Sequence, residues 1–162
     1  MSFAAVSYSG ILAQLQGSGV AHAISKSNHL IGATLQVAHI FGFILLLSSL
    51  TVVSLRLLGL AFTKQPVVEV ARDGTRLIWI GLALAVASGT LMFISGARHY
   101  GQNWAFEMKM GLLLAAVIAQ VALFQRVAAT DFPRPALART SAVVSLVLWF
   151  GVGLAGRMIG FI

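Results

Sequence analysis

The chain contains no cysteine and few acidic residues, with four Asp and Glu against eleven Lys and Arg in 162 residues. The absence of cysteine excludes disulfides, thiolate metal sites and covalent attachment of a c-type haem. Charged residues make up 9% of the chain, whereas a soluble domain carries about 25%. With 59% hydrophobic residues, the chain has too little polar surface to cover itself in water and is too apolar to be disordered. We therefore predict an integral membrane protein.

Long apolar runs dominate what is present. A membrane-spanning helix needs about 20 consecutive apolar residues, and strands of a membrane barrel would instead alternate. Because the connections are short, sequential helices are expected to be antiparallel neighbours. Asp73-Gly74 indicates a turn, and Pro133 and Pro135 indicate a helix stop. The sequence predicts an all-α protein, an up-down bundle of four transmembrane helices within residues 29–162, at about 29–60, 76–99, 104–126 and 140–162.

The first 28 residues form a separate N-terminal segment. No Lys or Arg precedes its apolar stretch, which argues against a cleaved signal peptide. We expect Phe3 to Gln16 to be a short helix lying on the outer membrane surface. Ser27 or Asn28 is expected to cap the first span.

The distribution of basic residues predicts the orientation. Cytoplasmic loops of membrane proteins are enriched in Lys and Arg. The two longer connections carry seven of them, and the opposite side carries four, namely Lys26, Arg98, Lys109 and Arg157. We expect a bacterial inner-membrane protein with both termini on the outer side. The net charge of +7 is explained by these cytoplasmic loops and does not indicate nucleic-acid binding.

Two histidines in the outer half of the spans suggest a cofactor, because an ionisable residue in a membrane is costly. If the helices are continuous, His39 lies about 25 Å above Arg56, and His99 lies about 35 Å above Arg76. The two imidazoles would then lie within about 10 Å of each other in depth. This arrangement fits the axial ligands of a b-type haem held between helices of a bundle.

The remaining candidate residues follow from this hypothesis. The anionic haem propionates would meet cations at the outer surface, and a glycine would leave room for the flat macrocycle. His29, His22 or Met92 could replace His99 as the second iron ligand. The candidate cofactor-binding set is His39, His99, Arg98, Arg157, Lys109 and Gly89.

Simpler roles compete with these. His39 could form an interhelical hydrogen bond with Gln120 or with a group such as Thr34, and Arg157 could pair with Glu107. A copper site is a weaker alternative, because its potential ligands show no recognisable spacing; they are His22, His29, Met108 and Met110.

The chain also resembles a family of uncharacterised bacterial four-helix inner-membrane proteins. The resemblance covers about residues 30–125 and is carried by His39-Ile-Phe-Gly42, by Leu55-Arg-Leu-Leu-Gly59 and by Phe106-Glu-Met-Lys109. That family is loosely grouped with copper-resistance-D-like and cytochrome b561-like proteins. The resemblance implies roles for His39, Arg56, Gly89 and Lys109, and it does not extend to His99. Ser54 stands where the family pattern has Asp.

Taken together, the sequence predicts a cytochrome b-like electron-transfer subunit that binds haem b near the outer, periplasmic face. It would pass electrons between a quinol in the lipid bilayer and a partner protein. The alternative is a non-catalytic structural or accessory subunit of a larger membrane complex. Partner subunits or further copies of the chain are expected in either case.

Overall fold

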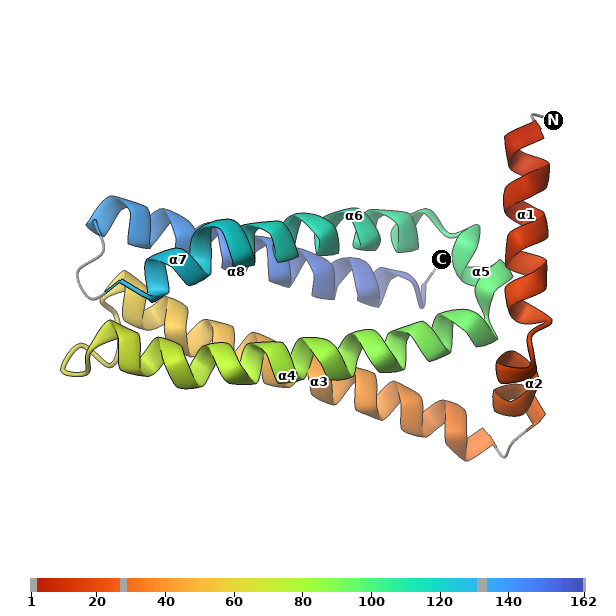
Figure 1. Ribbon diagram of the computed structural model, residues 1–162, viewed down its shortest axis with the longest axis horizontal. Helices are drawn as coiled ribbons and strands as arrows, with labels where there is room; N and C mark the ends of the chain where they lie inside the picture. Colours follow the sequence, from red (N-terminus) through yellow and green to blue (C-terminus); the bar gives the residue numbers. More distant parts are fainter. Residues whose placement is uncertain (1–2, 27–28, 131–133, 162) are drawn as a thin grey trace.

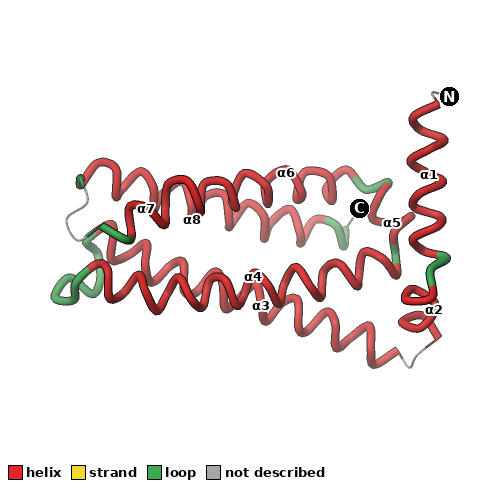
Figure 2. The backbone as a smooth tube through the Cα atoms, in the orientation of Figure 1, coloured by secondary structure: helices red, strands yellow, loops and turns green. Residues whose placement is uncertain are grey.

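The computed structural model describes residues 3–26, 29–130 and 134–161. Those residues fold into helices and short connections (Figure 2). A π-helical turn, η1, joins α6 to α7, so that these three form one span. The elements are α1 (Phe3–Gln16), α2 (Gly19–Lys26), α3 (His29–Leu58), α4 (Val67–Ser95), α5 (Ala97–Gly101), α6 (Trp104–Ala119), η1 (Gln120–Phe124), α7 (Gln125–Ala128) and α8 (Pro135–Met158).

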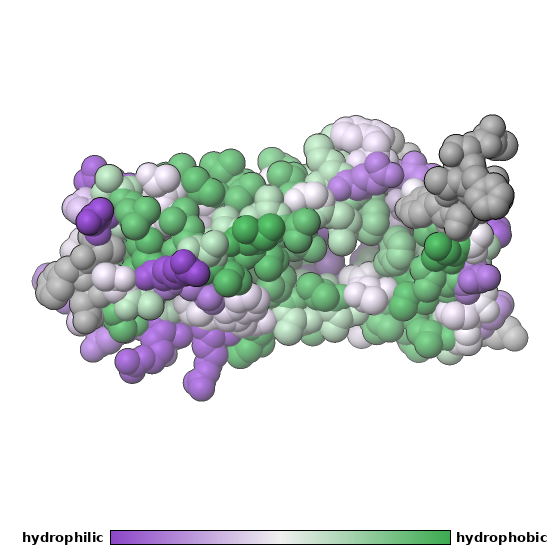
Figure 3. Space-filling view, turned by 45° about the horizontal axis from the view of Figure 1, so that its top comes forward, coloured by the Kyte–Doolittle hydropathy of each residue, from purple (hydrophilic) through white to green (hydrophobic). Residues whose placement is uncertain are grey.

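Four helical segments of the described chain are long and apolar enough to cross a membrane. The shortest has 24 residues and is therefore about 36 Å long, against a hydrocarbon core of about 30 Å. Their outward side chains are large and apolar, and include Val37, Phe41, Leu114, Val147 and Leu154. Hydrophobic side chains cover much of the face in Figure 3. The prediction of a multi-pass, four-helix membrane protein is confirmed.

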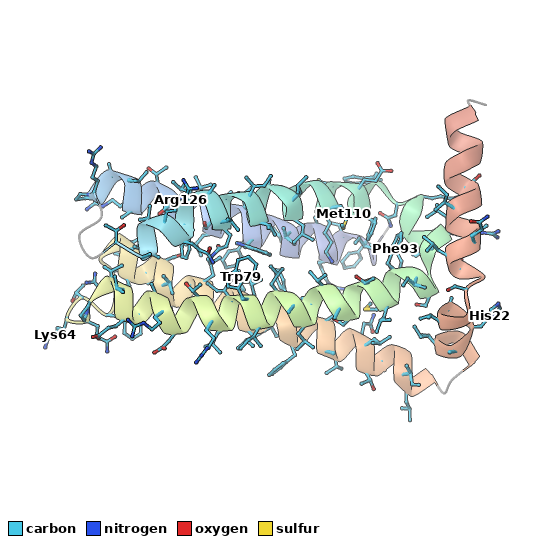
Figure 4. The ribbon with its side chains drawn as sticks, viewed as in Figure 1. His22, Lys64, Trp79, Phe93, Met110 and Arg126 are labelled. Carbon is cyan, nitrogen blue, oxygen red and sulfur yellow. The ribbon has the colours of Figure 1, made fainter. Side chains whose placement is uncertain are left out.

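The spans pack as two pairs. α3 packs along α4, α6 packs along α8, and α3 also contacts α8 (Figure 1). α1, α2 and α5 lie together at one end of the bundle, which we call the α5 end, and both termini lie toward it. Figure 4 shows His22 at this end and Lys64 at the other. The charge pattern predicts that the α5 end faces outward.

The N-terminal helix is confirmed with the expected bounds, and it runs across the α5 end of the bundle (Figure 1). Its contacts are with α5, α4 and α2. The second short helix, α2, was not predicted. The expected cap at Ser27 or Asn28 lies outside the described residues, and the placement of α1 on a membrane surface stays a prediction.

Two of the membrane-spanning helices begin earlier than predicted. α4 begins at Val67 and α8 at Pro135, both earlier than the apolar runs that mark the membrane. Charged first turns can project beyond the hydrocarbon, and proline fits the first turn of a helix. The prediction of a turn at Asp73-Gly74 is wrong, because Gly74 lies inside α4 against the side chain of Val53.

The contact between α3 and α4 depends on glycines. A Cβ atom on Gly81 would lie 2.6 Å from the carbonyl oxygen of Gly42 and 2.7 Å from the backbone nitrogen of Leu46. A Cβ atom on Gly42 would lie 2.8 Å from the backbone nitrogen of Ala85. Small residues let helices in lipid approach until their backbones touch. This approach brings α3 against the stretch of α4 that contains Ala85.

Gln120 is fully buried at the start of the π-helical turn, and neither of its amide atoms has a hydrogen-bond partner in the described chain. A buried polar group without a partner destabilises a fold by about 1–3 kcal/mol. We therefore expect Gln120→Met to stabilise the protein by about 1 kcal/mol in detergent unfolding experiments. A loss of stability instead would show that the amide is hydrogen-bonded in the native protein.

Candidate functional site

His39 is anchored to the neighbouring helix by one ring nitrogen. Its Nδ1 lies 2.8 Å from the carbonyl oxygen of Ala85 on α4. Because a carbonyl only accepts, Nδ1 carries the proton and donates it. The hydroxyl oxygen of Ser88 lies 3.4 Å from the same nitrogen and itself donates to the carbonyl of Leu84. The tautomer that results leaves the lone pair on Nε2.

Lys109 meets His39 at that second nitrogen. The Nζ atom of Lys109, on α6, lies 3.5 Å from Nε2 of His39. The lysine stem passes over Gly156 of α8, where an added Cβ would lie 3.2 Å from Nζ and 3.4 Å from Cε. Gly156 therefore leaves the space through which Lys109 reaches across the bundle.

Glycines also make room around the His39 ring. A Cβ atom on Gly89 would lie 2.9 Å from Cε1 and 3.1 Å from Nδ1 of His39. One on Gly153 would lie 2.9 Å from Cε1 of Phe43. Both glycines are in helices, where they serve close packing rather than an unusual backbone conformation. They allow side chains from α3 to lie against α4 and α8.

These side chains line a cavity of about 390 Å³ that opens at the surface of the bundle near the α5 end. Figure 3 shows a hollow in the half of the molecule that carries the N-terminal helices. One wall is aromatic, because the rings of Phe93 and Phe106 stack with centroids 5.2 Å apart and Tyr100 lies beside them. In Figure 4, Phe93 lies between α4 and α6.

The cavity is positively charged. Of the described residues that line it, Lys109 and Arg157 are the charged ones, and neither Asp nor Glu is among them. The expected alternative contact of Arg157 with Glu107 is not seen, and its guanidinium lies 4.5 Å from the centre of the Phe161 ring instead. An anionic group, or one with hydrogen-bond acceptors, would complement this lining.

The structure brings some predicted residues together and separates others. His39, Gly89, Met92, Lys109 and Arg157 line the one cavity. The other two members of the predicted set, Arg98 and His99, are exposed on α5 and are not among its lining residues.

The ring of His99 lies edge-on to Tyr100 with centroids 5.5 Å apart, and the backbone nitrogen of Arg98 donates to the side chain of Gln16. The depth estimate for His99 is wrong, because α4 ends at Ser95 and the chain turns into α5.

The alternatives for metal ligands do not converge in the described part of the chain. His22 is exposed on α2, and the side chain of His29 lies outside what the structure describes. Met108 and Met110 are both exposed on α6. No group of three or more His, Asp or Glu residues that could hold a metal ion is found among the described residues.

A comparison with protein-family models matches residues 2–162 to DUF6644, a family of unknown function. The chain belongs to DUF6644. No curated protein and no solved structure matches this DUF6644 chain. The match covers nearly the whole chain, the N-terminal helices included, and the four apolar helices are consistent with an uncharacterised membrane family. It provides no link to copper-resistance or cytochrome b561 proteins.

Three of the four residues that the family pattern implied, His39, Gly89 and Lys109, meet at the cavity. Arg56 lies toward the other end of α3, where its Nε donates to the carbonyl of Gln65.

The sequence does not indicate the Ala85 carbonyl, because a backbone acceptor carries no residue signature. Nor does it indicate the stacked pair Phe93 and Phe106, whose packing depends on where α5 turns the chain.

Proposed function

We propose that this chain is a membrane electron-transfer subunit that binds haem b in the His39 cavity. It would pass electrons between a quinol in the bilayer and a partner protein. One observation carries the proposal. A histidine within a membrane span lines a cavity; one of its ring nitrogens is held by a carbonyl, and the other, Nε2, has the amine of Lys109 3.5 Å away.

The residues of the cavity fit such a group by their chemistry. Metal-ligating histidines usually donate their other ring N–H to a carbonyl or carboxylate, as His39 does to Ala85. Glycines on α4 and α8 leave space beside the ring, and stacked aromatic rings offer an apolar wall. Lys109 and Arg157 could pair with carboxylates of the ligand.

When bound, haem supplies one-electron chemistry, and the protein contributes binding, orientation and the surrounding polarity. Ala85 would fix the tautomer and direction of His39. Arg157, exposed at the mouth of the cavity, would hold the anionic edge toward the α5 end. The apolar side chains Phe93 and Phe106 would keep water from the centre.

The variant His39→Gly, purified from haem-replete cells, tests the proposal. We expect it to lose nearly all bound haem, and to regain it when imidazole is added to the growth and purification media. Haem bound per chain would be measured against His99→Ala, which should equal the wild type. Equal haem in His39→Gly and wild type without imidazole would exclude His39 as the ligand.

A second candidate is favoured by the contact between Lys109 and His39. An amine and an imidazole that face the same cavity could hydrogen-bond the oxygens of a quinone headgroup, with the ring packed on the aromatic wall. In that case the wild-type protein would be free of haem, and organic extraction would yield quinone. Lys109→Ala would lower the extracted amount, and Arg98→Ala would leave it unchanged.

A further inference from the structure

We propose that the His39 cavity also binds the headgroup of an anionic membrane amphiphile, a carboxylate or phosphate that carries an apolar tail. This inference goes beyond the proposed function. Haem would need Lys109 to leave Nε2 of His39, whereas the amphiphile would bind the arrangement that the structure shows. The two ligands would therefore exclude each other.

The contact between Lys109 and His39 makes the cavity a site that donates hydrogen bonds. α3 packs against α4 and α8, and α6 packs against α8, so that α3 and α6 lie diagonally. Despite this, Nζ of Lys109 lies 3.5 Å from Nε2 of His39. Because Nδ1 donates to Ala85, Nε2 accepts and the amine donates. A protonated lysine amine keeps further N–H donors, which are available to a ligand in the cavity.

Lys109 and Arg157 lack a counter-charge in the described part of the chain. The guanidinium of Arg157, near the end of α8, lies over the Phe161 ring rather than against a carboxylate. Neither Asp nor Glu is among the described residues that line the cavity. A charge within a membrane span is costly unless it is paired. Lysine and arginine commonly bind carboxylate and phosphate oxygens, so such an anion would complete this lining.

The polar side chains of the cavity gather toward the α5 end. On α3 the lining extends from Gln36 to Ile44, which is about 12 Å along the helix. Because α3 begins and α8 ends at the α5 end, Gln36 and Arg157 lie nearer to it than Ile44 and Val152 do. The lining farther from that end is apolar. This polarity fits an amphiphile whose headgroup lies toward the α5 end and whose tail lies toward the bundle centre.

The cavity opens between side chains that face lipid. Ile40 and Ile44 line it, and they are 55% and 57% exposed within a membrane span. Toward the α5 end, α3 diverges from the other spans (Figure 1). A ligand dissolved in the bilayer would therefore reach the cavity from the side. The volume of about 390 Å³ suits a small ligand, so the headgroup and the adjoining part of the tail would fill it.

The test measures oleate binding to the wild-type protein in a non-ionic detergent, beside methyl oleate, which has the same chain without the charge. The protein is purified from haem-limited cells, so that haem does not occupy the cavity. We expect about one oleate per chain and roughly 10-fold weaker binding of methyl oleate, because hydrogen bonds to a charged group are lost. Oleoyl lysophosphatidate, measured in parallel, distinguishes the two headgroups, and tight binding of either one supports the site.

Two variants locate the bound anion. Lys109→Met keeps a long apolar stem and removes the amine, and Arg157→Gln removes the guanidinium. Each should weaken oleate binding by about 10-fold and leave methyl oleate binding unchanged. The matched control is Arg98→Gln, because Arg98 is exposed at the same end of the bundle and is not a lining residue. It should bind oleate as the wild type does.

Equal binding of oleate and methyl oleate by the wild type would overturn this inference, and that comparison does not depend on the folding of any variant. Oleate binding that is unchanged in both Lys109→Met and Arg157→Gln would overturn it as well. Either result leaves the haem proposal standing. Wild-type protein that binds oleate as expected, but carries no haem when purified from haem-replete cells, would overturn the proposed function alone.

Discussion

Replacing Gly81 with alanine is expected to destabilise the protein by about 3 kcal/mol, because overpacking costs about 1–3 kcal/mol even where neighbours can move. Here they cannot, since the new Cβ would meet the backbone atoms of Gly42 and Leu46 at 2.6 and 2.7 Å. The two helices would have to separate along their length. Unfolding in mixed detergent micelles, followed by circular dichroism, measures the change.

The matched control is Gly111→Ala on α6, where an added Cβ meets nothing within 4 Å. It should leave stability unchanged or raise it slightly, because alanine has the higher helix propensity. If Gly81→Ala were as stable as Gly111→Ala, the close crossing of α3 and α4 would be wrong. The position of His39 against Ala85 would then be wrong as well.

The variant Gly89→Val should abolish ligand binding with little loss of helical structure. Its side chain would displace the His39 ring, whose Cε1 and Nδ1 lie 2.9 and 3.1 Å from an added Cβ. The bond to Ala85 would break, and losing such an outer hydrogen bond costs about 10- to 100-fold in metal affinity. Haem content after purification, with the circular dichroism spectrum recorded in parallel, measures the effect.

Gly111→Val is the matched control for a branched side chain in a membrane helix. It should bind haem as the wild type does, since no atom of a neighbouring helix lies within 4 Å of a Cβ added at Gly111. Full haem content in Gly89→Val would mean that the orientation of His39 is not needed for binding. A complete loss of helical structure would instead show that Gly89 is required for folding.

The sequence predicts the spans well because their signal is local. Hydrocarbon requires long apolar helices, and the runs that begin at Leu30 and Trp104 satisfy that requirement on their own. The ends of the helices are less predictable, because hydropathy marks the membrane rather than the helix. α4 therefore begins at Val67, among charged residues, and ends at Ser95 rather than at His99.

The candidate site was predictable in part. The cost of a buried ionisable group draws attention to His39 and Lys109, 70 residues apart in the chain. That they face each other depends on which helices are diagonal, and on the space that Gly156 leaves for the lysine stem. Those are properties of packing that no local pattern contains. The Ala85 carbonyl, which sets the direction of His39, is likewise fixed only by the crossing of α3 and α4.

The most direct test of the account is the reduced-minus-oxidised absorption spectrum of the wild-type protein, purified in mild detergent from haem-replete cells and recorded beside His39→Ala. We expect a Soret band with sharp α and β bands in the wild type, and no such bands in the variant at equal protein concentration. A colourless wild-type preparation would contradict the haem assignment. If that preparation also contained fixed partner proteins, it would indicate an accessory subunit of a larger complex.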